Sequence, residues 1–146
     1  MRRLLRDCAV LFALIAFVSA CSPGHSSPSD SPSVNANPKT IKNPVPASPE
    51  SLANGKRLYD RLCAECHGAT GHGDGPTSRK LALAGEPRSP DLTDDKWDHG
   101  STDGEIFVDI RDGLGSTMRG LNGKPGIGPE EMWHLVNYVR SLGGKQ

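Results

Sequence analysis

The sequence predicts a small all-α domain over residues 49–146. Three segments carry apolar residues at helical spacing, and no window alternates between apolar and polar residues as a strand would. Two long stretches between the helices are rich in glycine and proline, which indicates irregular chain. From residue 51 onward, 12 Lys and Arg are balanced by 14 Asp and Glu, so the domain lacks the basic surface that nucleic acid requires.

The first predicted helix begins at Pro49. Ser48 is placed to cap it, Pro49 suits its first position, and Glu50 complements its dipole. Gly55 lies on the apolar face of this helix, which indicates a close approach by another helix. The other residues of that face are Leu58, Tyr59, Leu62 and Cys66. The helix therefore ends in the segment that contains two cysteines.

Two more helices are predicted further along the chain. One runs from Thr102, which forms a capping box with Glu105, to a stop at Gly113. The last begins at Gly128-Pro129 and is amphipathic. Its apolar stripe consists of Met132, Leu135, Val136, Val139 and Leu142, with Trp133 and Tyr138 beside it.

The stretches Gly68–Ser101 and Leu114–Ile127 have no predicted regular structure. Structureless loops of this length are unusual in a compact domain unless they have a surface to pack on. Aromatic residues make up only 5% of the chain, so the side-chain core is small, and small domains commonly need a staple or a prosthetic group. We therefore expect a large apolar group at the centre of the domain.

The pentapeptide Cys63-Ala64-Glu65-Cys66-His67 predicts that this group is a covalently attached haem c. Cysteines three residues apart lie on one face of a helical turn, so both sulfurs can join the vinyl groups of one porphyrin edge. The imidazole of His67 then lies where a neutral nitrogen can bind the iron. The alternatives are a thioredoxin-like pair, a zinc site and a structural disulfide. However, no strand precedes Cys63, no third cysteine follows Cys66, and so short a disulfide loop would crosslink almost nothing.

Residues 1–20 predict an exported lipoprotein. A basic head precedes an apolar run that is too short to span a bilayer. The sequence Val18-Ser19-Ala20-Cys21 resembles the bacterial lipobox, so Cys21 is the predicted lipid anchor to the membrane; an ordinary signal peptide is the alternative. Residues 21–48 would then be the lipidated cysteine and a Ser/Pro-rich tether, whose composition predicts disorder.

Over Pro49–Leu142 the chain resembles a class I monohaem cytochrome c. The resemblance rests on the haem motif, the loop Gly68–Pro76, a methionine in a glycine-rich loop, and Tyr138 in the closing helix. It implies the small cytochrome c fold, in which three main helices and long loops wrap around one covalently bound haem. It also implies that the first and last helices cross, with Gly55 against Tyr138 or an aromatic neighbour, Trp133.

The resemblance implies that Met118 is the second axial ligand of the iron, opposite His67. Arg119 follows Met118, where the family often has proline. The alternatives are a five-coordinate iron or another ligand among Met132, His72, His99 and His134. Family members also place a proline carbonyl on the proximal histidine, and Pro76 is the matching position. The candidate donors to the haem propionates are Arg79, Lys80, Arg88 and Trp97.

These features together predict an electron carrier rather than an enzyme. Coordination by His67 and Met118 leaves no open position on the iron, so no small-molecule substrate is expected. The protein would relay electrons between respiratory redox proteins by transient docking, without nucleic acid. It would work at the outer, periplasmic side of the bacterial cytoplasmic membrane, held there through Cys21. The alternatives are a haem c subunit of a larger dehydrogenase or oxidase, and a five-coordinate haem sensor or enzyme.

Overall fold

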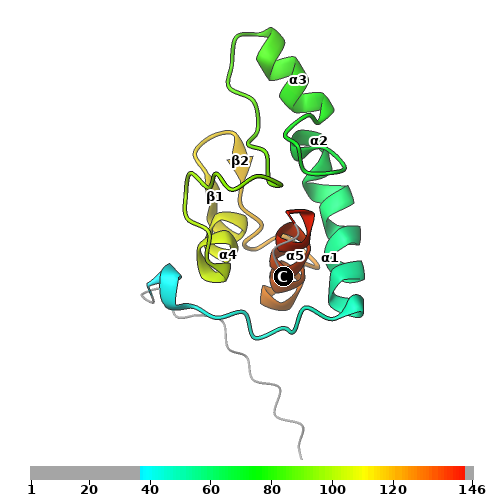
Figure 1. Cartoon of the computed structure of the whole chain (residues 1–146), viewed down its shortest axis with the longest axis vertical. Helices are drawn as coiled ribbons and strands as arrows, with labels where there is room; N and C mark the ends of the chain where they lie inside the picture. Colours follow the sequence, from blue (N-terminus) through cyan, green and yellow to red (C-terminus); the bar gives the residue numbers. More distant parts are fainter. Residues whose placement is uncertain (1–36, 144–146) are drawn as a thin grey trace, which may run out of the picture. The chain divides into compact units, whose positions relative to one another are not determined.

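The structure of the protein, a computed structural model, describes residues 37–143. Within them the chain forms five α-helices, a short 3-10 helix and one two-stranded hairpin, which confirms the predicted all-α fold (Figure 1). The predicted signal peptide, Cys21 and the first part of the predicted tether lie outside these residues. None of the described helices is long and apolar enough to cross a membrane. The elements are η1 (Pro38–Thr40), α1 (Pro49–Leu62), α2 (Ala64–His67), α3 (Pro76–Leu83), α4 (Asp103–Asp112), β1 (Gly113–Leu114), β2 (Met118–Arg119) and α5 (Pro129–Leu142).

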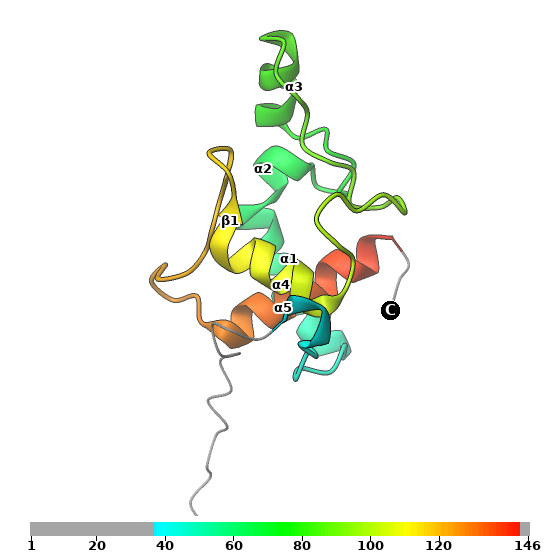
Figure 2. The ribbon, with the colours of Figure 1, turned by 90° about the vertical axis from the view of Figure 1, so that its left-hand side faces the viewer.

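The helices α1 and α5 pack closely against each other, as Figures 1 and 2 show. Gly55 lies at their closest approach, because a Cβ there would collide with the carbonyl oxygen of His134 and lie 2.7 Å from the Cβ of Tyr138. The ring of Tyr138 also packs against that of Tyr59, with the centroids 5.2 Å apart. The predicted pairing of Gly55 with Tyr138 is confirmed.

The helix starts follow the capping signals in the sequence. The hydroxyl of Ser48 accepts a hydrogen bond from the backbone N–H of Ser51, 3.1 Å away. At the start of α4 the N–H of Thr102 donates to the Glu105 carboxylate (3.0 Å), and Thr102 Oγ1 accepts from the N–H of Glu105 (3.3 Å). This is the predicted capping box.

The hydrophobic core is built from the inward faces of α1, α4 and α5. The ring of Phe107 stacks on that of Trp133 at a centroid distance of 4.0 Å, which joins α4 to α5. The indole N–H of Trp133 is buried and has no hydrogen-bond partner among the described residues. The buried apolar residues are Leu58, Tyr59, Ile106, Phe107, Ile110, Ile127, Met132, Trp133, Leu135, Val136 and Val139.

The structure differs from the sequence prediction in the two long stretches. The first contains α3, which begins with Pro76 at its first position and lies beside α2, away from α4 and α5 (Figures 1 and 2). The buried hydroxyl of Ser78 accepts from the N–H of Ser89, which joins α3 to the chain that returns from it. The second stretch contains the β1–β2 hairpin.

The structure also differs at the predicted tether. Residues 37–48, which we name the strap, pack on the domain. The side-chain amide of Asn137 donates to the carbonyls of Val45 (3.0 Å) and Pro46 (3.3 Å), and its oxygen accepts from Asn43 (2.8 Å). The side chains of Ile41 and Val45 pack against the core. The folded part of the chain therefore includes residues on the N-terminal side of position 49.

Candidate functional site

The haem motif continues α1 with only a slight break. Cys63 ends α1, where its N–H donates to the carbonyl of Tyr59 (2.8 Å). The carbonyl of Cys63 then accepts from the N–H groups of Cys66 (3.0 Å) and His67 (2.9 Å), which forms the single turn α2. Both thiols are free and half-buried. The predicted turn that carries two sulfurs and an imidazole is therefore present.

The imidazole of His67 has one nitrogen engaged by the protein. Its Nδ1 lies 3.4 Å from the carbonyl oxygen of Pro90, so the proton on Nδ1 is the donor and Nε2 is the lone-pair nitrogen. Burial lowers the pKa of His67, and the Pro90 carbonyl opposes this shift. The neutral ring with a free Nε2 is the form that binds iron.

The expectation that Pro76 supplies this carbonyl is wrong, because Pro90 supplies it. Pro76 instead occupies the first position of α3. The loop after the motif folds back on it, because the N–H of Gly73 donates to the carbonyl of His67 (2.8 Å). The chain that returns from α3 is bonded to this loop, since the N–H of Leu92 donates to the carbonyl of Gly71 (2.7 Å).

The cysteine that ends α1 is held as a neutral thiol. Burial first, and the neighbouring Cys66 second, raise the pKa of Cys63 to about 12. The sulfur of Cys63 therefore carries no charge at neutral pH.

Met118 lies in β2, opposite Leu114 of β1. Its side chain is half-buried and packs against the core together with other half-buried apolar groups of the motif, the loops and α4. These groups include Leu62, Cys63, Ala64, Leu92, Trp97, Val108, Met118 and Leu121. Half-buried apolar side chains on the same core as Cys63, together with two free thiols and an imidazole in one turn, fit a porphyrin, which needs apolar walls and donors of this kind. The residues present therefore fit a covalently bound haem.

The other candidate axial ligands are occupied elsewhere or lie at the surface. Met132 is 3% exposed and belongs to the core. His134 Nδ1 lies 2.8 Å from the hydroxyl of Ser51, and His72 Nδ1 lies 3.1 Å from the carboxylate of Asp91. His99 is exposed. This arrangement favours Met118 over these four side chains as the candidate second ligand of the iron.

Of the candidate propionate donors, Trp97 packs against the core and Arg79 donates to the carbonyl of Asp74. Lys80 and Arg88 are exposed. The contact of Pro90 with His67 was missed by the sequence prediction, since nothing marks this residue among the 12 prolines of the chain.

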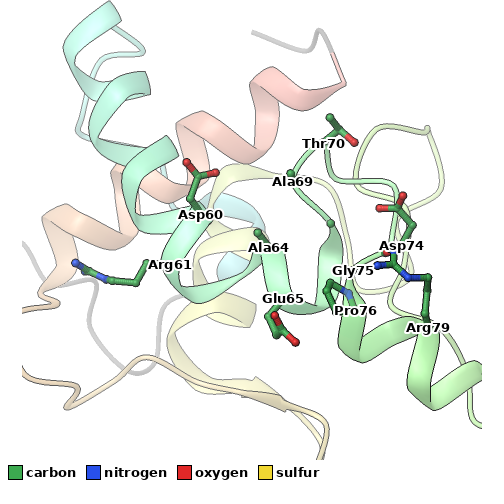
Figure 3. Close-up of a pocket in the computed structure, with 11 residues that line it drawn as sticks. Asp60, Arg61, Ala64, Glu65, Ala69, Thr70, Asp74, Gly75, Pro76 and Arg79 are labelled. Carbon is green, nitrogen blue, oxygen red and sulfur yellow. The ribbon is translucent and has the colours of Figure 1, made fainter.

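A surface pocket of about 470 Å³ lies between α1–α2 and α3, as Figure 3 shows. Its walls carry the charged side chains of Asp60, Arg61, Glu65, Asp74 and Arg79. Cys63, Cys66 and His67 do not line it. Charged walls do not suit an apolar macrocycle, so this pocket is distinct from the candidate haem site.

Comparison with known proteins identifies the family. The family model for cytochrome c matches residues 52–143. The chain is 32% identical over 109 residues to the cbb3-type cytochrome c oxidase subunit CcoP of Rubrivivax gelatinosus, which covers 73% of this chain and 32% of that protein. It is 29% identical over 106 residues to the subunit of the same name from Azospirillum sp. (strain B510). This match covers 65% of this chain and 32% of that protein. The chain thus spans about a third of the length of these curated relatives.

Solved structures show the same fold. A chain of the reducing HAO-like protein complex of Kuenenia stuttgartiensis matches with a TM-score of 0.58 and 26% identity, over 70% of this chain and 49% of that one. Cytochrome cL of Methylophaga aminisulfidivorans matches with a TM-score of 0.51 and 24% identity, over 64% of this chain and 54% of that one. The family match covers more than half of the chain and includes the haem motif, Met118 and α5. The chain therefore belongs to the cytochrome c family, as a class I c-type cytochrome.

Proposed function

We propose that this chain transfers electrons through one haem c, attached to Cys63 and Cys66 and coordinated by His67 and Met118. The observation that carries the proposal is the turn Cys63–His67, in which the Pro90 carbonyl engages Nδ1 of His67 and leaves Nε2 free. Membership of the cytochrome c family supports the same chemistry. When bound, the haem would supply an iron that alternates between Fe(II) and Fe(III).

The two axial residues have different roles in this proposal. The Pro90 carbonyl orients the His67 ring and fixes its tautomer. The thioether of Met118 is neutral, and such a ligand favours reduced iron and raises the reduction potential. Since both axial positions would be filled by the protein, substrate would have no place on the iron. The proposed role is therefore an electron carrier rather than an enzyme.

The proposed setting is the outer face of a bacterial cytoplasmic membrane. The basic and apolar start of the chain and the lipobox-like sequence ending at Cys21 support export and a lipid anchor. An anchor of this kind would raise the local concentration of the domain near membrane-bound redox partners. Docking with them would be transient, as is usual for electron-transfer pairs.

A second candidate is a haem c subunit fixed in a larger oxidase. The 32% identity to an oxidase subunit named CcoP favours it. The two candidates are distinguished by purifying the protein from its native membranes in mild detergent. A free carrier elutes alone, whereas a fixed subunit elutes with the other subunits of its complex.

The axial pair is tested by Met118→Ala in protein matured with its haem. We expect the variant to lose the weak red absorption band that methionine-ligated ferric haem gives, because that band requires sulfur on the iron. Mass spectrometry should still show the haem mass attached to the polypeptide. The matched control is Met132→Leu, which changes a core methionine and should keep the band. A band that survives in Met118→Ala would contradict the proposed ligand, and a bare polypeptide in the native protein would contradict the proposed cofactor.

A further inference from the structure

The hairpin that carries Met118 is attached to the end of α4 through its backbone. β1 follows α4 directly and pairs with β2 so that Leu114 lies opposite Met118. Beyond β2, the N–H of Leu121 donates to the carbonyl of Ile110 (3.0 Å). The N–H of Asn122 donates to the carbonyl of Arg111 (2.9 Å). These carbonyls belong to the last turn of α4, which lacks further helical partners, so the chain after Met118 satisfies them.

Gly113 lies against the backbone of Met118. Its φ is +80°, in the left-handed region that favours glycine. A Cβ at this position would collide with the carbonyl oxygen of Met118 and with the amide nitrogen of Gly120, and would lie 3.0 Å from the carbonyl carbon of Arg119. Any side chain at position 113 would therefore push the backbone of β2 away from α4.

Gly120 makes the matching contact from the other side. A Cβ there would lie 2.5 Å from both the carbonyl oxygen of Arg111 and the carbonyl carbon of Asp112. Gly120 is not among the glycines with positive φ. A close approach of two backbones, rather than a special dihedral angle, therefore requires glycine at this position.

The tip of the same hairpin shows no such crowding. Gly115 has a φ of +59°, and a Cβ there would meet nothing within 4 Å. The close packing is therefore confined to the base of the hairpin, where Gly113 lies opposite Arg119, the residue that follows Met118.

We infer that Gly113 and Gly120, which we name the glycine clamp, are positioning residues that fix Met118 for the iron. The inference deepens the proposed function and rests on Met118 being the axial ligand. A neutral thioether gains little from charge, so its bond to iron depends on the protein holding the sulfur in place. The clamp holds the backbone of Met118 against α4 and so sets where its side chain starts.

The test uses Gly113→Ala and Gly120→Ala in the full chain, matured with haem. We expect both variants to lose most of the red band of the oxidised protein while they keep the covalent haem mass and the helical circular dichroism. We also expect added imidazole to displace Met118 at lower concentration than in the unaltered protein. A purely structural role would lower the unfolding temperature without changing either readout.

The controls separate crowding from backbone strain. Gly115→Ala adds a side chain at positive φ in open space, so it tests strain alone and should keep the band. Gly120→Ala tests crowding alone, since its φ is ordinary. Gly113→Asn also adds a Cβ, but asparagine tolerates positive φ better than most other residues do. This variant replaces Gly113→Ala in the test if Gly113→Ala does not fold.

The outcomes distinguish this inference from the proposed function. If Met118→Ala loses the band while Gly113→Asn and Gly120→Ala keep it and bind imidazole as the unaltered protein does, the clamp is overturned and the ligand stands. If Gly115→Ala loses the band as fully as Gly113→Ala while Gly120→Ala keeps it, the clamp is overturned because strain alone explains the loss. If Met118→Ala keeps the band, the proposed ligand itself is wrong.

Discussion

Asp91 shows how single residues fix the chain beside the candidate site. Its carboxylate accepts from the hydroxyl of Thr93 (2.6 Å) and from the N–H of the same residue (2.8 Å). His72 Nδ1 lies 3.1 Å from its other oxygen. These hydrogen bonds, those of Thr93 first, lower the pKa of Asp91 from 3.8 to about 2. The carboxylate closes a turn immediately after Pro90, whose carbonyl contacts His67.

We expect Asp91 to titrate near pH 2 in the folded protein. Because its pKa is lowered by folding, its contribution to stability is present above pH 3.8 and is lost as the pH falls toward 2. Thr93→Val should return the pKa toward its ordinary value more than His72→Ala does, since the Thr93 hydroxyl contributes most. Carboxyl NMR shifts followed against pH measure this order, and the reverse order would contradict it.

For single residues, the sequence predicts the side chains that would hold the haem better than it predicts the groups that contact those side chains. Cys63, Cys66 and His67 are adjacent, so local helix geometry suffices to bring them together. The partner of His67 is 23 residues away in sequence, and only the path of the chain decides which proline reaches it. Pro76 was a wrong prediction because it begins α3, a short helix that the sequence pattern does not reveal.

At the scale of elements, the crossing of α1 and α5 depends on Gly55. In an isolated helix alanine would be favoured over glycine by about 1 kcal/mol. Here the added methyl would collide with the carbonyl of His134. The contact therefore makes alanine at position 55 destabilising, although helix propensity alone predicts that it would stabilise α1.

We expect Gly55→Ala to lower the free energy of unfolding by about 2 kcal/mol or more, as overpacking of a tight contact does. Thermal or denaturant unfolding of the holoprotein measures it. The control is Lys56→Ala on the exposed side of the same helix. Its ion pair with Asp60 is at the surface, so the substitution should leave the stability nearly unchanged. Stability equal to that of the unaltered protein would show that the helices separate without cost.

The three main helices were predictable because their caps and apolar faces are local signals. Thr102 with Glu105, and Pro49 after Ser48, mark the starts that the structure shows. The helix α3 was not predicted, since it is 8 residues long and carries few apolar side chains; its Leu83 is 90% exposed. The hairpin strands are two residues each, too short to produce an alternating pattern.

At the scale of the whole domain, the strap extends the fold beyond the family match, which begins at residue 52. Asn137 is 7% exposed and bonds to Asn43, to the carbonyls of the strap and to Ser51 (2.8 Å). Without the strap the oxygen of Asn137 would lose the bond from Asn43, and its amide would lose the two carbonyls and keep only the bond to Ser51. Each lost hydrogen bond costs about 0.5–1.5 kcal/mol. The strap is thus part of what stabilises α5.

We expect a chain that starts at residue 49 to be less stable than one that starts at residue 37, by about 3 kcal/mol or more. The reasons are the lost polar partners of Asn137 and the exposure of core surface now covered by Ile41 and Val45. Thermal unfolding of the two haem-loaded chains measures the difference. Equal melting temperatures would show that the strap contributes nothing.

The strap was not predictable from composition. Serine, proline and asparagine dominate residues 22–48 as a whole, and this composition indicates disorder. The residues that fasten the strap, Ile41, Asn43 and Val45, are few and find their partners about 90 positions away on α5 or in the core. Such long-range pairing leaves no periodic trace in the sequence.

The close approach of Gly73 to Ser89 bears on how the segment between them tolerates changes in length. A Cβ on Gly73 would collide with the carbonyl of Ser89, so the two ends of the segment that contains α3 meet in space. Insertions or deletions between them can therefore accumulate without moving the proline that contacts the histidine. We therefore expect a variant shortened between these two ends to keep the contact of Pro90 with His67.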